Sequence, residues 1–145
     1  YVSGSEWYSC GVDELGMIDC WGNKSFVSDI PVEENYTIVS SGIYHACALS
    51  SKGGVDCWGL NEYGETDVPE GVYISVSAGV FKTCGIKDDY SLSCWGDDRK
   101  GETEVPPSGE FIQIDASGFY HTCALRVDGK VVCWGDDSVG QSSPP

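Results

Sequence analysis

The sequence predicts an all-β chain of four tandem repeats, each with three to four short antiparallel strands, and two observations carry this prediction. The first is a pair of cysteines ten residues apart that recurs at steps of 37, 37 and 39 residues, each pair followed directly by a tryptophan. The second is the composition, in which 19 glycines and 6 prolines against one methionine indicate many turns and few long helices. Self-similarity at a fixed period is the signature of a repeat architecture.

Each cysteine pair is predicted to lie in a β-hairpin. With the turn of the second repeat at residues 51–54, Cys47 faces Cys57 and Leu49 faces Val55 across the two strands. Because side chains alternate along a strand, the cysteine pair and the aliphatic pair share one face of the hairpin. On the other face a small residue meets each tryptophan, in the pairs Ser9 with Trp21, Ala46 with Trp58, Thr83 with Trp95 and Thr122 with Trp134.

The even cysteine count at regular spacing indicates disulfides and an oxidising compartment, and therefore predicts a secreted, extracellular or cell-surface protein. Directly opposed strand residues provide the Cα separation of about 4.4–6.8 Å that a disulfide requires, so the spacing favours bridges within each repeat. Bridges between neighbouring repeats are the alternative. An intra-repeat bridge closes a loop of about ten residues, worth ~2–3 kcal/mol. The favoured pairs are Cys10–Cys20, Cys47–Cys57, Cys84–Cys94 and Cys123–Cys133.

A further strand is expected ahead of the hairpins, because segments such as 36–42 and 72–79 alternate apolar and small polar residues. Strands with apolar side chains on both faces must be covered on both sides, so the units should stack face to face, as in a propeller or a solenoid. We therefore expect residues 1–145 to form a single repeat domain. Its repeats span approximately 1–36, 37–73, 74–111 and 112–145.

The recurring pattern Ser-x-Gly-x-x-His-x-Cys-Ala-Leu, followed by Val-x-Cys-Trp-Gly and then by Gly-Gln and Val-Pro signals, resembles the repeats of the regulator-of-chromosome-condensation family of β-propellers. The short repeat is more similar to bacterial propeller-type β-lactamase inhibitors than to the nuclear members. The resemblance implies a β-propeller fold. The best-matching stretches are 41–42, 45–49, 55–59 and 64–69, with counterparts at 117–118, 121–125, 131–135 and 140–141.

The chain departs from that family in two respects. It has fewer repeats than the family's propellers typically have, and its paired cysteines are absent from the nuclear members. The nucleotide-exchange activity of the nuclear members is therefore not carried over. A net charge of −15, from 23 acidic and 8 basic residues, also repels phosphate backbones and anionic membranes. No apolar run approaches the ~18 residues of a membrane helix. We expect no nucleic-acid partner and no membrane insertion.

No motif for a nucleophile, a zinc site, a phosphate loop or a dinucleotide is present, so we expect no enzyme activity, no catalytic residues, no metal and no cofactor. The two histidines, His45 and His121, each precede a cysteine by two residues, and Tyr8 and Lys82 stand at the same position in the other repeats. A position that accepts three such different residue types is interpreted as a scaffold or surface position.

Acidic residues follow the Trp-Gly dipeptide of the third and fourth repeats. Calcium takes oxygen ligands of this kind, but the spacing matches no calcium loop, and Asn23 and residues 60–61 replace the acids elsewhere. We interpret these acids as solvated turn residues, with calcium binding as the alternative. They are Asp97, Asp98, Asp136 and Asp137, with Glu102 and Glu104 nearby.

One aromatic residue lies three positions before the first cysteine of every repeat. Four such rings could line one rim and grip a partner, or they could pack between the repeats. They are Trp7, Tyr44, Phe81 and Tyr120. Two sequons, Asn23-Lys24-Ser25 and Asn35-Tyr36-Thr37, also fall in expected turns, and we predict glycans at Asn23 and Asn35.

The two ends of the chain are complementary in sequence. If residues 143–145 are followed by residues 1–3, the junction imitates the internal join between a Val-Pro turn and a Val-Ser strand. The first hypothesis is therefore a non-catalytic extracellular structural protein that assembles with itself, its ends completed by neighbouring subunits or further repeats, for example in a head-to-tail filament. The alternative is a secreted module that binds another secreted protein or inhibits a secreted enzyme.

Overall fold

In the computed structural model, residues 1–23, 25–26, 28–32 and 35–145 are described, and within them the strands form four three-stranded antiparallel sheets. We call each sheet a blade and number the blades along the chain. The strands are β1 (Val2–Gly4), β2 (Tyr8–Val12) and β3 (Ile18–Gly22) in blade 1; β4 (Tyr36–Ser41), β5 (His45–Ser50) and β6 (Val55–Gly59) in blade 2; β7 (Tyr73–Ala78), β8 (Lys82–Lys87) and β9 (Leu92–Gly96) in blade 3; β10 (Phe111–Asp115), β11 (His121–Arg126) and β12 (Val131–Gly135) in blade 4.

The predicted hairpin register is confirmed. In blade 2, Cys47 pairs with Cys57. Leu49, two residues further along β5 and on the same face, pairs with Val55. The other blades repeat this register. All four disulfides lie within blades, with Cα atoms 4.0–4.1 Å apart, so bridges between repeats do not form. The additional strand predicted ahead of each hairpin is present as β1, β4, β7 and β10.

Each hairpin ends at the glycine of the Trp-Gly dipeptide, and this glycine is required by the backbone. Gly59 has φ 105°, and a Cβ atom there would lie 2.6 Å from the carbonyl oxygen of Tyr44. The chain therefore turns back over the loop that precedes the hairpin, and the backbone N–H of Leu60 donates to that carbonyl oxygen at 2.9 Å. The corresponding loops of the other blades are tied together in the same way.

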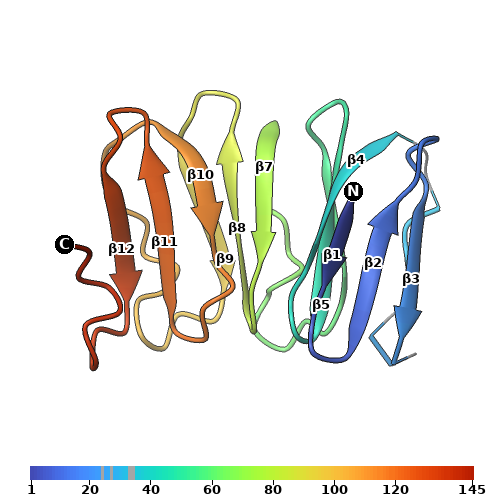
Figure 1. Cartoon of the computed structure of the whole chain (residues 1–145), viewed down its shortest axis with the longest axis horizontal. Helices are drawn as coiled ribbons and strands as arrows, with labels where there is room; N and C mark the ends of the chain where they lie inside the picture. Colours follow the sequence, from blue (N-terminus) through green and yellow to red (C-terminus); the bar gives the residue numbers. More distant parts are fainter. Residues whose placement is uncertain (24, 27, 33–34) are drawn as a thin grey trace.

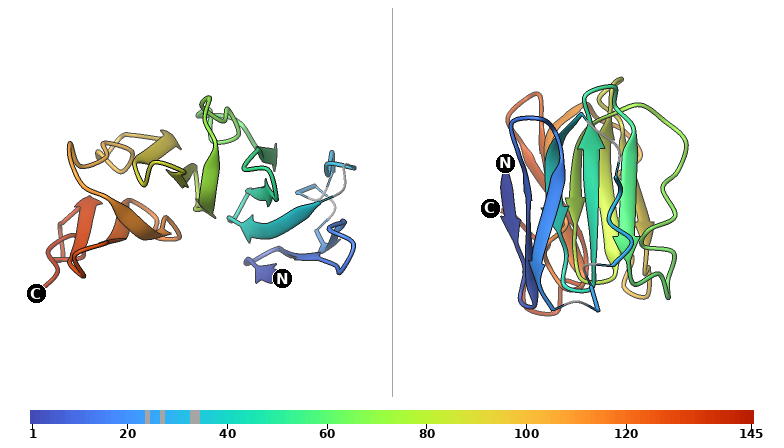
Figure 2. Two further views of the ribbon diagram at one scale, coloured as in Figure 1. Left: turned by 90° about the horizontal axis from the view of Figure 1, so that it is seen from above. Right: turned by 90° about the vertical axis from the view of Figure 1, so that its right-hand side faces the viewer.

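The blades stand side by side in an open arc (Figure 1, Figure 2). Strands β1, β4, β7 and β10 contact one another in sequence along the inner side of the arc, and the other two strands of each blade lie further out. The chain termini lie in the two end blades, as the view from above in Figure 2 shows. Among the described residues the buried apolar side chains gather into clusters that lie between successive blades.

Candidate interaction surfaces

Successive blades contact one another through two different faces. The face of blade 2 that carries the disulfide, with Cys47 and Leu49, packs against Tyr73, Val76 and Trp95 of blade 3. The same arrangement joins blade 1 to blade 2 and blade 3 to blade 4. Every blade therefore offers a cystine face to the blade that follows and a tryptophan face to the blade that precedes it.

A first polar contact joins the inner strands of neighbouring blades. The Ser40 hydroxyl oxygen on β4 accepts a hydrogen bond from the backbone N–H of Ala78 on β7, at 2.9 Å. The same bond recurs at each internal interface, from Ser41 N–H to Ser3 Oγ at 2.9 Å and from Ala116 N–H to Ser77 Oγ at 3.0 Å. These bonds fix the offset of one inner strand against the next. At the corresponding position of blade 4, the residue is Asp115.

A second polar contact binds the tryptophan of the blade that follows in the chain. The main-chain oxygen of Glu65, in the loop after blade 2, accepts from the Thr83 hydroxyl at 2.9 Å and from the Trp95 indole N–H at 3.0 Å. One blade further, the Glu102 main-chain oxygen accepts from the Thr122 hydroxyl at 3.0 Å and from the Trp134 indole N–H at 2.9 Å. At these two interfaces tryptophan contributes both its volume and its donor, whereas the buried indole N–H of Trp58 has no hydrogen-bond partner among the described residues.

A third polar contact starts from the position that holds His45 and Lys82. Both side chains are buried, so this position belongs to the scaffold. Thr83 donates its single hydroxyl proton to Glu65, and it therefore accepts from Nε2 of His45, which lies 2.7 Å away. Burial, with a smaller contribution from the positive charge of Lys82, lowers the His45 pKa to about 4.

Lys82 is a buried cation between blades 3 and 4. Its ammonium group donates to the Gly118 carbonyl oxygen at 2.5 Å and to the Phe119 carbonyl oxygen at 3.4 Å. Burial lowers the Lys82 pKa to about 8, against the opposing effect of nearby carboxylates. Lys82 therefore holds blade 4 as His45 holds blade 3, with a different donor.

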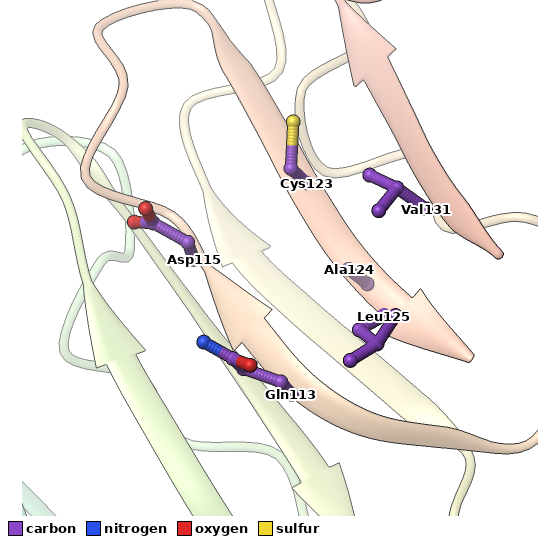
Figure 3. A pocket seen from close by; sticks show the side chains of 6 residues that line it. All are labelled: Gln113, Asp115, Cys123, Ala124, Leu125 and Val131. Carbon is purple, nitrogen blue, oxygen red and sulfur yellow. The ribbon is translucent and has the colours of Figure 1, made fainter. Parts of the chain in front are cut away.

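On each of the two end blades, one of these faces is not covered by any of the described residues. On blade 1 the N-terminal face, formed by Val2, Ser9, Gly11 and Trp21, has the tryptophan 54% exposed, whereas Trp58 and Trp95 are 4% and 7% exposed. On blade 4 the cystine face is hollowed by a cavity of about 200 Å³ (Figure 3). We call this the C-terminal face; it is lined by Gln113, Asp115, Cys123, Ala124, Leu125 and Val131.

The aromatic residues predicted for the rim are brought together in part. Tyr44 stacks on Phe81 with ring centroids 5.2 Å apart, and Phe81 reaches Tyr120 through Phe119, at 6.1 and 4.8 Å. Trp7 is exposed on blade 1, where the backbone N–H of Asn23 donates to its carbonyl oxygen. We call Tyr44, Tyr63, Phe81, Phe119 and Tyr120 the aromatic row.

Two members of the aromatic row, Tyr63 and Phe119, lie outside the position predicted for the rim. Tyr63 shares its position, the fifth after a tryptophan, with Phe26, whose ring centroid lies 5.6 Å from that of Tyr44. Phe119 stands where other repeats have Ile43 or Val80, so periodicity gives no signal for it. Tyr63 contacts the edge of Phe81 at 5.3 Å, and the Arg99 guanidinium lies 5.0 Å from the Tyr63 ring centroid. The sequence signal that could have indicated these two residues is the presence of aromatic residues in consecutive loops between the expected strands.

The interpretation of the turn acids as solvated is wrong for Asp97 and Glu102, which are both buried. Asp97 is paired with Arg99 at 2.6 Å, and this bond lowers the Asp97 pKa. A side-chain oxygen of Glu102 accepts from the backbone N–H of Lys100 at 2.7 Å and so closes its own turn. Within the described ranges, no group of three or more potential ligands is arranged for a metal ion.

The predicted glycosylation sites remain predictions. The Asn23 side-chain oxygen accepts from the Ser25 backbone N–H at 3.0 Å, while Lys24 lies outside the described residues. Asn35 is exposed with φ 81°. In the part of the chain that the structure describes, no helix has the length and apolar character needed to cross a membrane.

Comparison with known proteins identifies the repeat. The family model of the regulator of chromosome condensation (RCC1) repeat matches residues 36–65 and 111–141. Among curated protein sequences none matches the chain.

Solved structures extend the likeness to the whole arc. The CRINKLY WD40 ectodomain of the Arabidopsis thaliana receptor kinase ACR4 is 29% identical, with a TM-score of 0.78 over 92% of this chain and 48% of that one. The ectodomain of the Physcomitrella patens receptor kinase CR4 is 31% identical, with a TM-score of 0.78 over 92% of this chain and 40% of that one. Saccharomyces cerevisiae Prp20p, at 16% identity, shares the fold with a TM-score of 0.81 over all of this chain and 45% of that one.

The chain thus spans less than half the length of these structures. The repeat match, the disulfide-stapled three-stranded blades and the shared fold agree with one another. Residues 36–65 and 111–141 are thus RCC1-type repeats, and the four blades share the fold of an RCC1-type β-propeller.

Proposed function

We propose that this chain is a non-catalytic extracellular module that assembles by adding blades of its own type to its open end faces. Four disulfides fit an oxidising compartment, and two of the similar structures are receptor ectodomains. The observation that carries the proposal is the pair of uncovered faces. The N-terminal face and the C-terminal face are the two halves of an interface that the chain already forms between its own blades.

Such addition is head-to-tail, because a cystine face packs on a tryptophan face and not on another cystine face. A contact of this kind is heterologous, and it gives a closed ring or an open filament according to the rotation between subunits. The blades that complete the ends belong to further repeats or to a second copy of the chain. Residues 1–145 act as one domain in this proposal, since the apolar clusters continue from blade to blade.

Sedimentation of residues 1–145 from micromolar to millimolar concentration tests the proposal. We expect concentration-dependent association that Leu125→Asp, which places a charge in the cavity of the C-terminal face, abolishes. Leu15→Asp is the matched control, because Leu15 is 76% exposed in the hairpin turn of blade 1. This variant should associate as the wild type does. A chain that stays monomeric at every concentration overturns self-assembly.

A second candidate function is binding of another secreted protein, such as an enzyme that the module inhibits. The aromatic row favours it, because aromatic rings and an arginine are the residues that dominate protein interfaces. Phe119→Ser would abolish binding to such a partner and leave association through the end faces unchanged.

A further inference from the structure

We propose that the C-terminal face selects its occupant through three polar groups and accepts a blade that presents a tryptophan, with the N-terminal face of a second copy as that occupant. This inference rests on the proposed end-to-end addition of blades and names what that addition recognises. The three groups are the Gln141 main-chain oxygen, the His121 side chain and the Asp115 carboxylate. The groups they meet on the second copy are the Trp21 indole, the Ser9 hydroxyl and the Gly4 backbone N–H.

Gln141 supplies the acceptor for the indole. In the loops after blades 2 and 3, the residue whose main-chain oxygen holds the next tryptophan also closes its turn with its own side chain, as Glu65 does by accepting from Tyr63 N–H at 2.7 Å. Gln141 stands at the third such position, and its side-chain oxygen accepts from Val139 N–H at 2.9 Å. The turn after blade 4 therefore has the same form, and its Gln141 carbonyl is available to an incoming indole.

His121 supplies a donor for a hydroxyl group. It stands at the position of His45, whose Nε2 donates to Thr83 across the interface. Thr83 is paired with Trp95 on its own blade, as Ser9 is paired with Trp21 on blade 1. The hydroxyl of Ser9 can therefore accept from His121 and donate to the same carbonyl oxygen as the indole, as Thr83 does.

Asp115 supplies the acceptor on the inner strand. Ser3, Ser40 and Ser77 use this position to accept from the backbone N–H of the next blade. Asp115 has one carboxylate oxygen bonded to Ser117 N–H at 2.9 Å, and a carboxylate has capacity for further donors. A charged acceptor binds an N–H more strongly than a hydroxyl does. On blade 1 the equivalent donor is Gly4, which pairs with Ser9 as Ala78 pairs with Thr83.

The apolar parts of the two faces match as well. Val2 stands at the position of Val39 and Val76, which pack against the cystine face of the preceding blade.

The indole resonances of the ¹⁵N-labelled chain provide the first measurement. As the concentration of residues 1–145 rises, we expect the Trp21 indole N–H to shift downfield as it gains an acceptor, whereas the Trp7 indole on the rim keeps its position. Association without a shift of Trp21 overturns the inference and leaves the proposed function standing. The absence of association at any concentration overturns both.

Trp21→Phe provides the second measurement, because it keeps an aromatic ring and removes the donor. We expect its dissociation constant, measured by sedimentation, to rise roughly 2–10-fold, the loss expected for one neutral hydrogen bond. Trp7→Phe is the matched control and should associate like the wild type, since Trp7 lies outside the N-terminal face. Equal dissociation constants for Trp21→Phe and the wild type overturn the selection of tryptophan. Both substituted residues are exposed, so both variants should fold.

Discussion

The tryptophan face of blade 3 is covered by blade 2, whereas the tryptophan face of blade 1, the N-terminal face, is exposed. Trp95 is 7% exposed, whereas Trp21 is 54% exposed at the same position of its blade. Both tryptophans follow the second cysteine of a disulfide and face a small hydroxyl residue across the hairpin. The difference in burial therefore comes from the neighbouring blade, and the hydrophobic core of this protein belongs to pairs of blades.

As in other repeat proteins, the free energy of unfolding should therefore be a sum of two kinds of contribution. One comes from each blade, and the other from each interface between neighbouring blades. The disulfide stabilises a single blade, because it closes a loop of that blade alone. The tryptophan, the inner-strand serine and the buried histidine stabilise the junction with another blade. A substitution at one of these junction positions should therefore have a large effect inside the arc and a small effect at its end.

The largest expected contrast is between Trp95→Ala and Trp21→Ala. Trp95→Ala removes a buried ring that packs on Tyr73 and leaves the Glu65 carbonyl oxygen without its indole donor, so it should lower the free energy of unfolding by ~3–5 kcal/mol. Trp21→Ala should cost less than about 1 kcal/mol at concentrations where the chain is monomeric. Guanidinium unfolding of the two variants measures both values. Equal losses would contradict a core that is shared between blades.

The second contrast uses pH. The His45 pKa in the folded protein is about 4, below its value of about 6.5 in an unfolded chain, so the unfolded state binds more protons between these values. The contribution of His45 to stability is complete above pH 6.5 and is lost as the pH falls towards 4, by an amount on the order of 3 kcal/mol. Urea midpoints measured across this range should fall less steeply in His45→Gln than in the wild type.

His121 provides the control for that experiment, because it stands at the same position of blade 4 with no following blade against it in the structure. His121→Gln should keep the steep wild-type dependence between pH 6.5 and 4. If His45→Gln keeps it as well, the acid sensitivity comes from other groups.

The parts of the structure that the sequence predicts are those that a single blade determines. The pairing of Cys47 with Cys57 and of Leu49 with Val55 is fixed by the spacing of two cysteines about one turn, which is a local property. The same reasoning correctly places the tryptophan opposite a small residue, as for Thr83 and Trp95.

The features that the sequence analysis missed depend on two blades at once. Asp97 and Glu102 follow a Trp-Gly turn and would be solvated in an isolated blade, but they are buried in the arc. Lys82 is buried with its ammonium group donating a hydrogen bond to the Gly118 carbonyl oxygen of the next blade, and no pattern within a repeat encodes that contact. The aromatic row likewise joins loops of different blades through Phe119, which breaks the repeat.

The smallest contrast concerns the inner strands. Ser40→Ala removes the oxygen that accepts from Ala78 N–H, and the unpaired N–H lies in a partly buried contact between β4 and β7, so stability should fall by about 1 kcal/mol. Asp115→Ala removes the equivalent acceptor of blade 4, where no blade in the structure supplies a donor, so the exposed bond to Ser117 and a solvent-screened attraction to the Lys82 ammonium group are lost. Its cost should be a few tenths of a kcal/mol. Thermal unfolding of dilute samples compares the two. If association then raises the thermal stability of the wild type but not of Asp115→Ala, the side chain at position 115 contributes to stability only when another blade lies against it.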